Sequence, residues 1–109
     1  MRWFRRNKQP RPGTLRGPEP HDFSHLEEFV RSRRGVEAYV EPQTTVTAMT
    51  VVLIAHDGEW TRRRIGGPED ARRLGQKLSI PVYDVAATGY PNRMREWTRR
   101  QKEASRNEG

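Results

Sequence analysis

The hydrophobic residues of this chain are concentrated in its middle. Of the 19 Leu, Ile, Val and Phe residues, 17 lie within residues 22–97. Residues 1–20 contain four Pro and two Gly and show no apolar period. A segment of this composition buries too little apolar surface to offset the entropy lost on ordering. We therefore expect a disordered basic arm over residues 1–20 and a single domain over residues 21–97.

The first predicted helix has Ser24 as its N-cap residue. Ser24 and Glu27 have the spacing of a capping box, in which each side chain bonds the other residue's backbone N–H. Leu26 and Phe29 then share one face of the helix, and Gly35 is suited to end it.

Three predicted strands follow this helix. Residues 36–41 alternate apolar and polar side chains, which is typical of a half-buried strand. Residues 48–56 contain the run VVLIA, so we expect a central strand that is buried on both faces. Asp57-Gly58 is the preferred pair for a two-residue type I′ turn. Residues 59–65 return antiparallel, and three consecutive Arg favour an edge position.

The last third of the chain predicts helix, strand and helix. Residues 66–78 combine a Gly-Gly-Pro start, two acidic residues and a helical apolar stripe. Residues 80–86 form a short strand, and strand–helix–strand order predicts a right-handed crossover and a parallel pair. A final helix begins at Pro91, and we expect it to fray after Trp97 into a basic tail over residues 98–109.

The fold class that follows is a small mixed α/β (α+β) domain. Its order is α-β-β-β-α-β-α, with about four strands in one mixed sheet. A core of this size buries only about 60% of its extended-chain surface. Contact with a partner, or with a second copy in a homodimer, would therefore add stability.

Charge separates the core from the two ends. The chain has a net charge of +7, but residues 22–97 contain 11 basic and 11 acidic residues. Residues 1–21 carry 6 basic and 1 acidic residue, and residues 98–109 carry 4 and 2, which gives +5 and +2. The excess positive charge therefore lies outside the core, where it favours an acidic or polyanionic partner.

Several functional classes lack their sequence signals. There is no Cys, which excludes disulfides, thiolate catalysis and cysteine-bound metals. The longest apolar run, residues 51–55, is far too short for a transmembrane segment. No nicotinamide or flavin fingerprint is present. We expect a cytoplasmic protein with no cofactor.

Three stretches of the chain are similar to one group of proteins. HDFSHLEEFVRSRRGVEAYVEP, HDGEWTRRR and IPVYDV…GYPNRMREW resemble short actinobacterial proteins without an assigned activity, some of which carry a generic oxidoreductase label. The resemblance covers most of residues 21–97. It implies a bacterial cytosol, and it transfers no catalytic residue.

One candidate metal site lies at the start of the first helix. His21, Asp22 and His25 have the His-x-x-x-His spacing of zinc ligands. If Ser24 is the N-cap, His21 precedes the helix and the two His do not share a face. The capping interpretation is favoured, and we predict no metal.

A candidate anion site lies at residues 62–68. A strand end, two Gly and a helix start come together there, with Arg62 and Arg64 nearby. Glu69 and Asp70 already lie at the positive end of that helix and would repel phosphate. We therefore favour ordinary capping.

A third candidate is acid–base catalysis by polar residues at strand ends. These are His56, Asp57, Tyr83, Asp84 and Tyr90. None has the nucleophile–base–orienter spacing of a known motif, so no catalytic residue is assigned.

Tryptophan among arginine is the remaining pattern. Arg neutralises phosphate, and flat aromatic rings stack on unpaired bases. Trp60 and Trp97 have an alternative role as core anchors, whereas the RWFRR stretch at the N-terminus does not. The predicted polyanion-binding residues are Arg2, Trp3, Arg5, Arg6, Arg95, Arg99 and Arg100.

The sequence thus predicts a non-enzymatic accessory protein. Its core would dock on an acidic protein surface or an RNA-containing assembly, such as a ribosome or polymerase, and its basic ends would hold the polyanion. Direct binding of single-stranded RNA and a small enzyme are the alternatives. A membrane-surface anchor through MRWFRRNK lacks a long apolar face.

Overall fold

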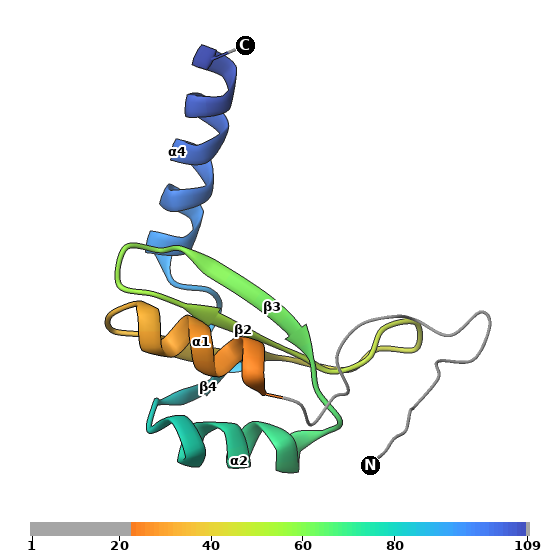
Figure 1. Ribbon diagram of the computed structural model, residues 1–109. Coiled ribbons are helices and arrows are strands. Elements are labelled where there is room, and N and C mark those ends of the chain that lie inside the picture. The colour runs from red at the N-terminus through yellow and green to blue at the C-terminus, as the bar shows by residue number, and fades with distance from the viewer. Residues whose placement is uncertain (1–22, 109) are drawn as a thin grey trace, which may run out of the picture.

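The computed structural model describes residues 23–108 (Figure 1). The elements in chain order are α1 (Ser24–Ser32), β1 (Glu37–Glu41), β2 (Thr50–Ile54), β3 (Trp60–Arg64), α2 (Pro68–Leu78), β4 (Val82–Asp84), α3 (Val85–Thr88) and α4 (Asn92–Glu108). The predicted mixed four-stranded sheet and its α-β-β-β-α-β-α order are confirmed, with the single turn of α3 added before the last helix.

The strands lie in the order β3-β2-β1-β4. The pairs β3–β2 and β2–β1 are antiparallel, and β1–β4 is parallel. The central position of β2 and the edge position of β3 are therefore confirmed. A parallel pair forms as predicted, but its partners are β4 and β1: β4 lies at the far edge of the sheet and does not pair with β3, the strand that precedes α2.

Each face of the sheet has its own core. Alternation along β2 sends Val51 and Leu53 toward α1 and α2, where they pack with residues that include Leu26 and Leu74. Val52 and Ile54 point to the opposite face and form a second, smaller cluster with Tyr39. Trp60, Val85, Tyr90 and Met94 pack against that smaller cluster, so α3 and the start of α4 cover the second face.

The alternation in β1 predicts that Tyr39 is exposed, and this is wrong. Tyr39 is buried in the second core beside Val52 and Ile54, and its ring lies 5.2 Å from that of Tyr83 on the neighbouring strand β4. The face of β1 that was predicted to be polar is thus packed as well, and the aromatic pair of Tyr39 and Tyr83 lies on it.

The predicted start of α1 is also wrong. Ser24 is the first helical residue and Phe23 is the N-cap, with no side-chain cap bond. The carbonyl of Phe23 accepts the first helical bond, from Glu27 N–H at 2.8 Å. Burial of Phe23 in the core explains the earlier start, since it fixes the chain one residue before the predicted cap.

The β2–β3 turn differs from the predicted type I′ hairpin. It has three residues, His56 to Gly58, between Ala55 and Glu59, and Ala55 N–H donates to Glu59 O at 2.8 Å. Among the described turn residues only Gly58 has a positive φ, of +98°. Asp57 instead accepts a hydrogen bond from Glu59 N–H at 3.0 Å. A three-residue loop that ends in such a glycine is the next commonest hairpin solution.

Helix α4 does not end after Trp97, as the loss of apolar residues predicts. It continues to Glu108 and projects away from the sheet (Figure 1). Residues 101–107 are exposed. One ion pair within the helix, from Arg99 to Glu103 at 3.1 Å, spans the point where it leaves the body of the domain.

Candidate functional site

The start of α4 is fixed to the sheet by Arg93. Its Nε donates to Ala55 O at 2.9 Å, and its Nη2 lies 2.7 Å from a Glu37 carboxylate oxygen. That carboxylate oxygen also accepts a hydrogen bond from Tyr39 Oη at 3.0 Å. The guanidinium therefore joins the last helix to the carbonyl that follows β2 and to a side chain of β1.

The hairpin turn touches the same part of α4. A Cβ at Gly58 would lie 2.0 Å from the carbonyl oxygen of Arg93 and 2.8 Å from Trp97 Cβ. Two further bonds follow along the helix. Trp60 Nε1 donates to Thr98 Oγ1 at 3.1 Å, and Arg100 Nη2 donates to Asp57 O at 3.1 Å. These contacts set the direction in which the helix projects.

A stripe of cations runs along the free side of α4. At 100° per residue, Arg95, Arg99, Lys102 and Arg106 lie within an arc of about 60°. All four residues are exposed. Arg99 is paired with Glu103, whereas no ion pair joins Arg95, Lys102 or Arg106 to another described side chain. We call these four residues the α4 stripe.

A groove lies beside the α4 stripe. Its volume is about 360 Å³, and its lining residues are Tyr90, Met94, Arg95, Thr98, Arg99 and Lys102. The aromatic ring and the thioether are contributed by the residues that also pack on the second core. One side of the groove is therefore cationic, while its inner end is apolar.

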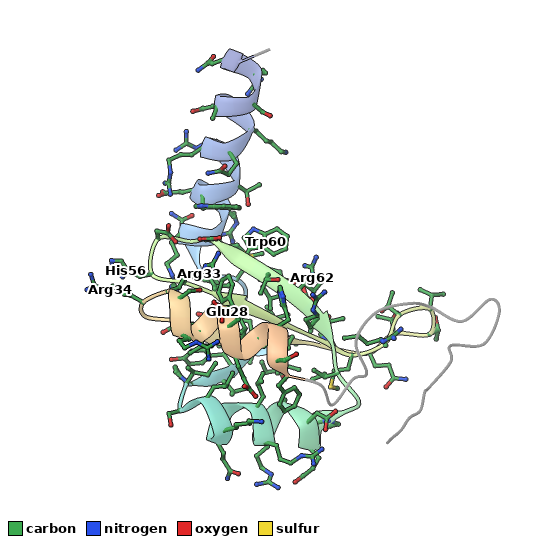
Figure 2. The ribbon with its side chains drawn as sticks, viewed as in Figure 1. Glu28, Arg33, Arg34, His56, Trp60 and Arg62 are labelled. Atoms are coloured by element: carbon green, nitrogen blue, oxygen red, sulfur yellow. The ribbon has the colours of Figure 1, made fainter. Side chains whose placement is uncertain are left out.

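The sheet supplies charged residues next to this groove. Arg62 of β3 makes a bidentate ion pair with Glu41, at 2.8 and 2.9 Å, and its guanidinium lies 5.2 Å from the Trp60 ring centroid. Glu41 also accepts hydrogen bonds from Thr50 and Tyr90. Figure 2 shows Trp60 near the start of α4, with Arg62 further along the same strand.

Glu41 is the titrating group of this network. Burial by itself would raise the pKa of Glu41, but hydrogen bonds from Arg62, Thr50 and Tyr90 outweigh it and lower the pKa below its ordinary 4.5. The pKa of Tyr90 is raised, first by burial and then by its bond to Glu41. The ionised carboxylate and the neutral phenol are thus the paired states.

This arrangement predicts an acid-dependent loss of stability. Because the folded-state pKa of Glu41 is depressed, its contribution is present above about pH 4.5 and is lost as the pH falls below that value. Glu41→Gln should cost about 1–2 kcal/mol at pH 7, since Arg62 stays partly hydrated. Urea unfolding at pH 7 and pH 3 measures both effects. The variant should lose less stability than wild type between the two pH values; an equal or larger loss would contradict the assignment.

No family model, curated protein or solved structure matches this chain. The resemblance to short actinobacterial proteins therefore stays a prediction.

The structure brings together only part of the predicted polyanion-binding set. Arg95 and Arg99 lie on the α4 stripe. Arg100 lies on another side of the helix, where it bonds the hairpin carbonyl of Asp57. Lys102 and Arg106 were missed, although their spacing of seven and eleven residues from Arg95 is the signal that could have found them. The N-terminal members of the set, Arg2, Trp3, Arg5 and Arg6, lie outside the described residues.

The candidate anion site at residues 62–68 is occupied by the protein itself. Asp70 is buried, and its carboxylate accepts a hydrogen bond from Gly66 N–H at 2.8 Å and pairs with Arg73. Arg62 is engaged with Glu41 on the opposite face of the sheet. The capping interpretation of this segment is the one that the contacts support.

The candidate acid–base residues have separate roles. Asp84 accepts a hydrogen bond from Ala86 N–H at 2.9 Å and caps α3, and Tyr83 packs on Tyr39. Tyr90 bonds Glu41, while His56 and Asp57 belong to the hairpin turn. No shared reaction centre results from these contacts.

The candidate metal ligands are only partly described, because His21 and Asp22 lie outside residues 23–108. His25 Nε2 lies 3.0 Å from Thr61 Oγ1, and its pKa is lowered by burial and by the nearby Arg63 and Arg33. Among residues 23–108 no group of three His, Asp or Glu is placed to bind a metal ion. No helix in this range is long and apolar enough to cross a bilayer.

Proposed function

We propose that this chain is a non-enzymatic accessory protein that binds RNA through the projecting helix α4. The observation that carries the proposal is the α4 stripe, in which four exposed cations share one side of a helix that extends beyond the domain. A row of Arg and Lys neutralises phosphates and releases their counterions, which supplies most of non-specific nucleic-acid affinity. We place the assembly in the cytosol, with a ribosome or polymerase as the candidate RNA-containing partner.

The distribution of charge supports a polyanion more than an enzyme substrate. The acidic residues nearest to the stripe on the helix are Glu96 and Glu103, and both already accept bonds from helix neighbours, at 3.0 and 3.1 Å. In the sheet and in helices α1 and α2, by contrast, most of the basic side chains are held in ion pairs. Arg95, Lys102 and Arg106 make no ion pair with another described side chain, and an extended chain of phosphates can reach several of them at once.

The test is a variant that removes three charges from the stripe. Arg95→Gln/Arg99→Gln/Lys102→Gln should weaken binding of a labelled single-stranded RNA by at least about tenfold at 100 mM salt, because three phosphate contacts are lost. Gln has nearly the same helix propensity as Arg and Lys, so the helix should persist. Fluorescence anisotropy measures the affinity, and circular dichroism checks the fold.

A matched control separates local from total charge. Arg31→Gln/Arg34→Gln/Arg72→Gln removes the same charge from exposed positions on or beside α1 and α2, none of which lines the groove. The control should bind RNA within about twofold of wild type. Equal losses in the two triple variants would mean that net charge, and not the α4 stripe, governs binding. The N-terminal Arg2, Arg5 and Arg6 can be tested in the same assay as a triple change to Glu.

A further inference from the structure

We propose that the groove beside α4 takes one unpaired base of a single-stranded nucleic acid, with the adjoining phosphates on Arg95, Arg99 and Lys102. This inference rests on the proposed RNA-binding function. It adds the strandedness of the ligand and the position of a base.

The chemistry of the groove matches the two parts of a nucleotide. The ring of Tyr90 and the thioether of Met94 supply a flat, polarisable surface on which a base can lie. The cations of Arg95, Arg99 and Lys102 border the same space. Arg99 would exchange its pairing with Glu103 for a phosphate, which costs little because both side chains are at least half exposed.

The size of the groove favours a single ring system. A volume of about 360 Å³ lies at the lower end of the range for small-ligand sites. In a duplex the bases are stacked and paired, so they cannot enter such a groove without being flipped out. A single strand presents its bases freely, and it can place a base and the neighbouring phosphates together.

An acidic protein helix fits this surface less well. A partner helix needs an apolar seam that repeats over several turns. Beyond Met94 and Trp97, the exposed end of α4 has Ala104 as its only apolar residue among residues 101–107. The apolar contact is therefore confined to one short groove, which suits a base better than a second helix.

The experiment compares three polyanions against the full chain at equal salt. These are a single-stranded RNA, the duplex of the same sequence, and inorganic polyphosphate of similar length. The single strand should bind about tenfold more tightly than the other two. In Met94→Gln the advantage should disappear while the salt dependence stays, because the cations are unchanged. Met49→Gln, a like change in the other core, is the control and should keep the preference.

The outcomes separate the two proposals. Equal binding of single strand and duplex, with a salt dependence that needs the α4 stripe, would overturn the base site and leave the RNA-binding function standing. No binding of any polyanion at 50 mM salt would overturn both and leave an acidic protein as the partner. If Met94→Gln fails to fold, the base site can be tested with wild-type protein and a strand that contains the fluorescent base 2-aminopurine. Its emission should change in parallel with anisotropy, and unchanged emission on binding would overturn the base site.

Discussion

Replacing Gly58 by Ala should destabilise the folded chain by about 2–4 kcal/mol and loosen α4 from the sheet. The added Cβ would lie 2.0 Å from a backbone oxygen of Arg93, and a backbone atom has no rotamer with which to move away. The φ of +98° adds strain for any side chain. Urea unfolding followed by circular dichroism measures the loss of stability and of helix content. RNA affinity should fall with it, because the α4 stripe loses its fixed position.

Gly89→Ala is the matched control for this change. Gly89 has a φ of +72°, but a Cβ there would have no atom within 4 Å. The substitution should therefore cost only the strain of the backbone conformation, about 1–3 kcal/mol, with no added steric clash. Similar losses in the two variants would show that the contact between Gly58 and α4 contributes nothing.

Replacing Arg93 by Met should cost about 2–3 kcal/mol. The variant loses the bond to Ala55 O and the pairing with Glu37, whose side chain is only 29% exposed and is left without its cation. Arg93→Lys should recover only part of this, since a single ammonium cannot bond both partners with the geometry of a guanidinium. Thermal and urea unfolding give the comparison.

Arg95→Met, two residues further along the same helix, is the control for Arg93→Met. Arg95 is exposed and belongs to the α4 stripe, so the change should leave stability within about 0.5 kcal/mol of wild type and lower RNA affinity. Comparison of the two variants therefore distinguishes the anchoring of α4 to the sheet from the binding of RNA. A stability loss as large at residue 95 as at residue 93 would contradict the assigned anchor.

The sheet could be predicted from sequence because its signals are local and strong. The residues VVLI of β2 have no solvated face, and the three Arg of β3 favour an edge. Pro68 at the first position of α2 fixes that helix start within one residue. These features depend on residues that are close together in the sequence, so the residue pattern alone predicts them.

The features that were predicted wrongly or missed depend on tertiary contacts. The burial of Tyr39 depends on residues that are distant in the chain, such as Val85 and Met94, and its ring contact is with Tyr83, which is 44 residues away. The conformation of the β2–β3 turn places Gly58 against α4, and an Asp-Gly pair does not reveal that constraint. The groove needs Tyr90 to be held by its bond to Glu41, again across the chain. In the last helix the cationic spacing was visible in the sequence, but the expected end after Trp97 concealed it.

The measurement that tests the account most directly is the salt dependence of single-stranded RNA binding by wild type and by the triple stripe variant at Arg95, Arg99 and Lys102. Each phosphate contact on a single strand contributes about −0.7 to the slope of log K against log salt. The slope for wild type should be steeper than that for the variant by about 2. Raising the salt from 50 to 200 mM should therefore cost wild type about 20-fold more affinity than it costs the variant, because of these three contacts. Parallel slopes in the two proteins, or no binding by wild type at 50 mM salt, would contradict the claim that α4 is an RNA-binding surface.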